Sequence, residues 1–129
     1  MDRASFIKVL EENHGVVVVK YGATWCGPCK KIEGFLESKR CELPKNVGYY
    51  ALDVDDDFDL YALFKSKKQV RGVPVVLAFK QGNVTPYSDA CVTGTSPDEL
   101  KHFFSTVHGW AAQAERLKSV HHNLSNSLS

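Results

Sequence analysis

Ala23-Thr24-Trp25-Cys26-Gly27-Pro28-Cys29-Lys30 places two cysteines three residues apart, shortly after a run of four valines at residues 16–19. The valine run is short, β-branched and without polar alternation, which predicts a strand buried on both faces. Downstream of the cysteines, apolar residues recur at helical spacing through residues 32–36. We therefore expect the cysteine pair where a buried strand gives way to the first turn of a helix.

That position suits thiol–disulfide exchange. Backbone N–H groups and the helix dipole at a helix N-terminus favour an anion, which lowers the pKa of Cys26 and raises its thiolate fraction. Cys29 follows about one turn later and becomes the resolving thiol. Pro28 restricts the turn, and Gly27 allows the backbone of another protein to approach. We expect the Cys26 thiolate to attack a substrate disulfide and Cys29 to release the reduced substrate from the mixed disulfide.

The remaining sequence predicts alternating helices and strands. Helices are expected near residues 4–13, from the cysteine turn onward, after the acidic residues 55–57, and from Ser96-Pro97 onward. Strands are expected near residues 16–19, 47–54, 75–79 and 84–92, with a hairpin turn at residues 81–83. This order predicts an α/β fold with a central mixed sheet of four to five strands, flanked by helices on both faces.

We expect one domain over residues 1–108 and a C-terminal extension over residues 109–129. Helical periodicity continues beyond Val107, but Gly109 interrupts it at a cost of roughly 1 kcal/mol relative to alanine. The extension is therefore predicted to be a frayed helix to about residue 120. Its Ser- and Asn-rich end, residues 123–129, is predicted to be disordered.

Composition excludes several functional classes. The 129 residues carry a formal net charge of +1, so neither nucleic acid nor an anionic membrane is an expected partner. The sequence has no apolar run of about 18 residues, so no membrane span is expected. The N-terminal residues do not resemble a secretory signal. We therefore expect a cytoplasmic, reducing environment, where a Cys-x-x-Cys is more often catalytic or metal-binding than a permanent crosslink.

Zinc is the main alternative for the cysteine pair, because structural zinc is also bound by Cys-x-x-Cys. Such sites take four ligands, typically in two pairs. Here Cys41 and Cys91 are isolated, and the adjacent His121 and His122 would not share a helix face. We therefore expect redox chemistry at Cys26 and Cys29, no bound metal, and ordinary structural roles for the other two cysteines.

The segment from Ala23 to Lys30 resembles the active-site segment of thioredoxins, and the resemblance extends over roughly residues 4–107. A second match is Gly72-Val73-Pro74, and a third is Gly94 before the last helix. The resemblance implies a cis peptide bond before Pro74, packed against the cysteines. It also implies a substrate groove formed by Trp25, Gly27, Pro28, Val73, Pro74 and Gly94, with a substrate strand hydrogen-bonded to the Val73 backbone.

The sequence departs from thioredoxins at Lys20. The family usually carries a buried aspartate at this position, and the lysine that accompanies it corresponds to Ala51 here. If the Lys20 ammonium lies beneath the site, it lowers the pKa of the cysteines; if it reaches the surface, resolution relies on water or another group. Asp53 on the neighbouring predicted strand is a potential partner for Lys20.

The resemblance implies a protein-disulfide reductase that needs no cofactor beyond its Cys26–Cys29 disulfide. It would act as a monomer in cell redox homeostasis and electron transport, reducing disulfide-containing proteins and taking electrons from a thioredoxin-reductase-type or other dithiol donor. Two alternatives stay open. One is a dedicated redox partner of a single protein. The other is a thioredoxin-like adapter that binds through its groove or its C-terminal extension.

Overall fold

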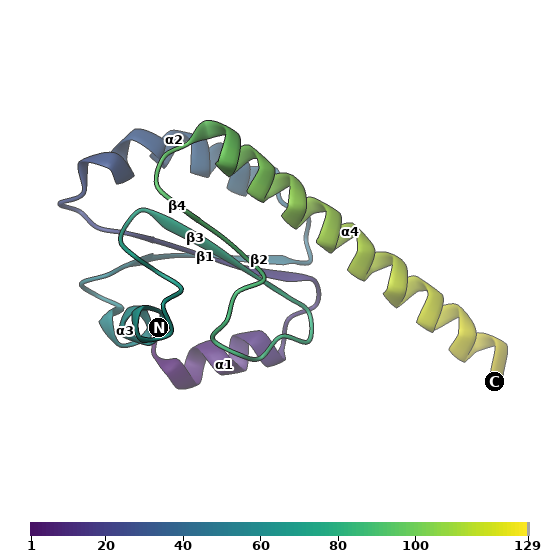
Figure 1. The fold of residues 1–129 in the computed structure, drawn as a ribbon. Helices are drawn as coiled ribbons and strands as arrows, with labels where there is room; N and C mark the ends of the chain where they lie inside the picture. The colour runs from purple at the N-terminus through teal and green to yellow at the C-terminus, as the bar shows by residue number, and fades with distance from the viewer. Residues whose placement is uncertain (129) are drawn as a thin grey trace.

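The structure is a computed structural model that describes residues 1–128. Its helices and strands alternate as the sequence predicts (Figure 1). They are α1 (Arg3–Glu11), β1 (Val16–Gly22), α2 (Gly27–Cys41), β2 (Val47–Asp53), α3 (Phe58–Ser66), β3 (Val75–Lys80), β4 (Ala90–Thr93) and α4 (Pro97–Leu128). The strands form one mixed sheet in the order β2-β1-β3-β4. The β1–β2 pair is parallel, and the β1–β3 and β3–β4 pairs are antiparallel. The predicted fold class is confirmed.

Helices cover both faces of the sheet, with α2 and α4 on one side and α1 and α3 on the other (Figure 1). Side chains of β1 alternate between the two faces. Val17, Val19 and Tyr21 pack on the α1/α3 side, whereas Val16 and Val18 pack on the α2/α4 side. All five are at most 3% exposed, which explains why the strand shows no polar alternation in the sequence.

Strand β4 is shorter than predicted, because residues 81–89 form a loop instead of the first part of a strand. The Asn83 side chain organises this loop: its amide donates to Tyr87 O and to Asp89 Oδ2, and its carbonyl accepts from the Thr85 backbone. Pro86, in the middle of the loop, has no N–H to give to a ladder. Local side-chain bonds therefore replace strand pairing up to Asp89.

Helix α4 continues through Gly109 without a break and runs to Leu128, which differs from the predicted fraying near residue 120 and the predicted disorder beyond it. Val107 and Ala111, on either side of Gly109, are fully buried, and Asn46 donates to Ala111 O. Packing on both sides of Gly109 thus outweighs its low helix propensity. The later part of α4 projects beyond the sheet (Figure 1). The domain division at residue 108 stays a prediction, and Ser129 lies outside the described residues.

Among residues 1–128, no helix is both long enough and apolar enough to cross a lipid bilayer.

We expect Phe64→Ala to lower the free energy of unfolding by about 3–5 kcal/mol, because the ring is fully buried against Phe6, Tyr21 and Phe79. The control is Phe58→Ala at the start of the same helix, where the ring is 66% exposed and the expected change is below about 0.5 kcal/mol. Urea unfolding monitored by circular dichroism measures both. Similar losses in the two variants would contradict the assigned core.

Candidate active site

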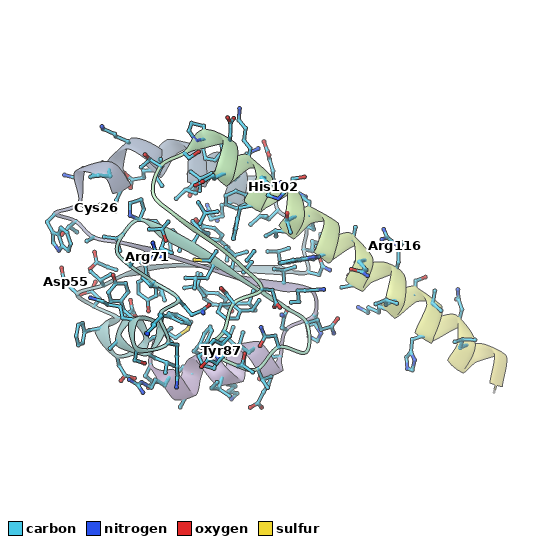
Figure 2. All side chains as sticks on the ribbon, viewed as in Figure 1. Cys26, Asp55, Arg71, Tyr87, His102 and Arg116 are labelled. Atoms are coloured by element: carbon cyan, nitrogen blue, oxygen red, sulfur yellow. A yellow bond between two sulfur atoms is a disulfide. The ribbon has the colours of Figure 1, made fainter. Side chains whose placement is uncertain are left out.

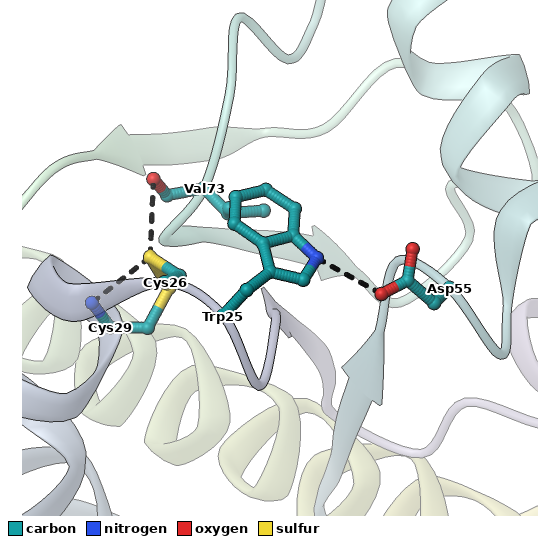
Figure 3. Close-up of a disulfide and its surroundings, with 5 residues drawn as sticks. All are labelled: Trp25, Cys26, Cys29, Asp55 and Val73. Atoms are coloured by element: carbon teal, nitrogen blue, oxygen red, sulfur yellow. Dashed lines mark hydrogen bonds between the residues drawn. A yellow bond between two sulfur atoms is a disulfide. The ribbon is translucent and has the colours of Figure 1, made fainter.

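Cys26 and Cys29 lie at the start of α2 and form a disulfide, with their Cα atoms 5.3 Å apart. Cys26 is the N-cap residue in an extended conformation, and its sulfur accepts a hydrogen bond from the Cys29 backbone N–H at 3.1 Å (Figure 3). Pro28 occupies the first turn, where its missing N–H breaks no helical hydrogen bond. Cys26 thus lies at the helix N-terminus as expected, and a thiolate there would be stabilised by the N–H groups of the first turn.

The two cysteines are buried: Cys26 is 5% exposed and Cys29 is 7% exposed. Trp25 next to them is 67% exposed, and its indole Nε1 donates to Asp55 Oδ2 at 3.0 Å. Asp53 supports this contact, because its side chain accepts from the Asp55 backbone N–H at 2.8 Å. The Trp25 side chain is thereby held beside the disulfide (Figure 3).

Asp55 is a site residue that no motif in the sequence indicated. Residues 55–57 were expected only to lead into the next helix, where Asp57 is the N-cap residue but makes no side-chain cap bond. Parallel pairing of β1 and β2 brings the ends of both strands to the same edge of the sheet. In Figure 2, Asp55 and Cys26 accordingly lie at the same end of the molecule. The available sequence signal was that Trp25 and Asp55 each follow one of two strands expected to pair in parallel, which places them at the same edge of the sheet.

The predicted cis peptide bond before Pro74 is confirmed. Val73 O lies 3.9 Å from Cys26 Sγ (Figure 3). In the disulfide Cys26 has no S–H group, so this contact is not a hydrogen bond. When Cys26 is a reduced thiol, its S–H can donate to Val73 O. The Gly94 backbone N–H donates to Pro74 O at 2.9 Å, and Gly94 has a φ of +104°, which favours glycine. The structure therefore brings the 25–29, 73–74 and 94 segments together.

The surface around the disulfide is open at three glycines. A methyl group placed on Gly27, Gly72 or Gly94 would have no other protein atom within 4 Å, apart from the chain immediately around it. Gly27 adjoins the disulfide, and Gly94 is hydrogen-bonded to Pro74. This open surface fits the predicted groove for an extended segment, and the substrate contacts of the groove residues stay predictions.

Lys20 is half-buried and lies near Cys29, and the effect of its ammonium on the cysteines stays a prediction. It pairs with Ala51 across the sheet and lines an open cavity of about 520 Å³, together with Cys29, Glu33 and Asp53. Lys20 and Asp53 share this cavity, but no ion pair joins them within residues 1–128.

The other two cysteines lie away from the disulfide and are exposed. Desolvation of its thiol raises the pKa of Cys91, and its sulfur donates to Gln69 O at 3.5 Å. In the part of the chain that the structure describes, no group of three or more His, Cys, Asp and Glu side chains is arranged to hold a metal ion.

Comparisons with known proteins agree with this geometry. The sequence model of the thioredoxin family matches residues 1–106. Thioredoxin-1 of Saccharomyces cerevisiae is 37% identical over 86 residues, which cover 67% of this chain and 75% of that protein. A thioredoxin of Aspergillus fumigatus is 37% identical over 101 residues, which cover 78% of this chain and 84% of that protein. The crystal structure of a Malassezia sympodialis thioredoxin aligns with a TM-score of 0.63 and 29% identity, covering 83% of this chain and 88% of that one.

We expect iodoacetamide at pH 6 to alkylate Cys26 of the reduced protein roughly fivefold faster than Cys41, and Cys91 most slowly. The helix N-terminus increases the thiolate fraction of Cys26, whereas desolvation raises the pKa of Cys91. Time-resolved peptide mass spectrometry measures the rate at each cysteine. Equal rates at Cys26 and Cys41 would show that the N-cap position does not activate the thiol.

Proposed function

The chain belongs to the thioredoxin family, and from that premise we propose that it reduces protein disulfides with Cys26 as the attacking thiolate and Cys29 as the resolving thiol. It is a thiol–disulfide oxidoreductase of the thioredoxin type, and its redox group is the Cys26–Cys29 disulfide. The observation that carries the assignment of roles is the 3.1 Å hydrogen bond from the Cys29 N–H to Cys26 Sγ. This bond supports negative charge on Cys26, which is the sulfur that must attack first.

The reaction runs in two exchanges. The Cys26 thiolate attacks one sulfur of the substrate disulfide, the substrate S–S bond breaks, and the leaving sulfur takes a proton. Cys29, ionised in turn, attacks Cys26 Sγ in the mixed disulfide and displaces the second substrate sulfur. Two electrons pass to the substrate, and the protein is left with its Cys26–Cys29 disulfide. A dithiol donor of the thioredoxin-reductase type then restores the two thiols.

We assign substrate binding to the groove over the disulfide. Trp25 and Pro28 form one wall, and the Val73-Pro74 backbone and Gly94 form the other. Open space at Gly27 and Gly94 supports the approach of an extended substrate segment. Such a segment would hydrogen-bond to the Val73 backbone, as an added strand does.

The cellular setting belongs to the proposal as well. We place the protein in the cytoplasm, as a monomer in redox homeostasis and electron transport. Cys41 and Cys91 are unpaired and exposed, a state that a reducing compartment maintains.

We expect Cys29→Ser to accumulate mixed disulfides with protein substrates, because the resolving thiol is absent. Cys26→Ser should form none, because the attacking sulfur is gone. Cys41→Ser is the matched control and should release its substrates as the wild type does. Non-reducing electrophoresis followed by mass spectrometry identifies the trapped proteins. Equal trapping by Cys26→Ser and Cys29→Ser would reverse or refute the assigned roles.

An adapter function is the second candidate, favoured by the projecting part of α4. Leu117, Val120 and Leu124 there are 64%, 56% and 59% exposed. An adapter would show no insulin reduction with dithiothreitol, and its Cys26→Ser/Cys29→Ser variant would still bind its partner. We expect instead that wild type reduces insulin and that Leu117→Ser leaves this rate unchanged, because the residue is remote from the disulfide.

A further inference from the structure

Lys20 is an unusual residue for its place in the fold. It lies in β1, between β2 and β3, opposite Ala51 on one neighbour and Val76 on the other. It is the only residue of β1 that is not buried. Charged side chains rarely occupy such a position without a partner, because removing an ammonium from water is costly. Lys20 nevertheless belongs to no ion pair within the described residues 1–128.

The Lys20 ammonium and the Cys29 sulfur lie close to the same point in the structure. Both lie beside Gly22: a Cβ at that glycine would be 3.2 Å from Lys20 Nζ and 3.7 Å from Cys29 Sγ. Because Gly22 has no side chain, it places no atoms between the Lys20 ammonium and the Cys29 sulfur. The cavity of about 520 Å³ extends from this point toward solvent. Water in it would give Cys29 a route for its proton.

The other charged groups around this cavity have mixed signs. Lys30 and Glu33 face it from α2, and Asp53 faces it from the end of β2. Both carboxylates would oppose a negative charge on Cys29, whereas the two lysines would favour it. Lys20 is the lysine whose Nζ lies beside the Cys29 sulfur at Gly22, in a partly buried position where solvent screens its charge less.

We propose that Lys20 is the electrostatic partner of Cys29 in the reduced enzyme and promotes the resolving step. The proposal rests on the oxidoreductase function and adds a positioning residue to it. In the disulfide the Cys29 sulfur carries no charge for the ammonium to pair with. Once Cys29 is free, its proton leaves to water and the thiolate faces the ammonium. The thiolate then attacks Cys26 Sγ, and the bond from Cys26 to the substrate breaks.

We expect Lys20→Met to move the pH midpoint of Cys29 ionisation upward by about one unit, because an ammonium close to a thiol favours its charged form. Lys20→Arg keeps the charge and should stay near wild type. Lys31→Met, on the exposed side of α2 and away from the cavity, is the control for loss of a lysine. The measurement is the alkylation rate of Cys29 against pH in the reduced protein, and it requires no protein substrate. Lys20→Gln provides a second neutral side chain should Lys20→Met not fold.

The reduction potential gives an independent readout. Wild-type Lys20 stabilises the thiolate form, so its removal disfavours the reduced protein wherever Cys29 is ionised. A one-unit change corresponds to a tenfold change in the equilibrium at alkaline pH, or about 30 mV for this two-electron couple. We expect Lys20→Met to be more reducing by that amount at pH values above the Cys29 midpoints of both proteins. At acid pH, where Cys29 is a thiol in both proteins, the two potentials should be equal.

Two results would overturn the proposal. An unchanged Cys29 midpoint in Lys20→Met would show that the ammonium does not act on the thiolate. Equal shifts in Lys20→Met and Lys20→Arg would assign the effect to packing rather than to charge. Failure of the reductase function itself would appear elsewhere, as absence of trapping by Cys29→Ser, while the Cys29 titration would still report on Lys20.

Discussion

Strand β1 is hydrogen-bonded along both edges and covered by helices on both faces, and the position of the redox pair depends on that enclosure. Its valines and Tyr21 are buried and fixed by packing on each side. The chain leaves this strand at Gly22 and enters α2 only a few residues later. A short connection from a rigid strand leaves little freedom, so Cys26 is held at the N-cap of α2, where backbone N–H groups favour a thiolate.

The order of strands in the sheet determines which segments border the disulfide. β3 is antiparallel to β1, so Val73 and Pro74 precede β3 at the edge where β1 ends. β4 is antiparallel to β3, so Gly94 follows β4 at that edge and donates to Pro74 O. β2 is parallel to β1 and brings Asp55 to Trp25. Four segments separated by up to about seventy residues thus contribute to one surface because their strands share a sheet.

The two cysteines have different electrostatic surroundings. Cys26 is supported by the N-terminus of α2, a feature of backbone geometry that exists wherever a helix begins. Cys29 lies next to a cavity whose charged groups come from β1, α2 and β2. Its ionisation therefore depends on side chains particular to this chain, above all on the Lys20 ammonium, which lies near its sulfur beside Gly22. The attacking step uses a general property of helices, and the resolving step is open to adjustment by sequence.

The sequence alone determined the features that arise from neighbouring residues. The valine run predicted a doubly buried strand, the Cys-Gly-Pro-Cys turn predicted a helix start with Cys26 near its N-terminus, and the resemblance implied the cis bond before Pro74. Only the tertiary structure decided the rest. The bond from Trp25 to Asp55, the place of the Lys20 ammonium and the continuity of α4 through Gly109 depend on contacts between distant segments. Local pattern constrains backbone conformation within a few residues, whereas the direction of a lysine or the survival of a helix depends on what packs beside it.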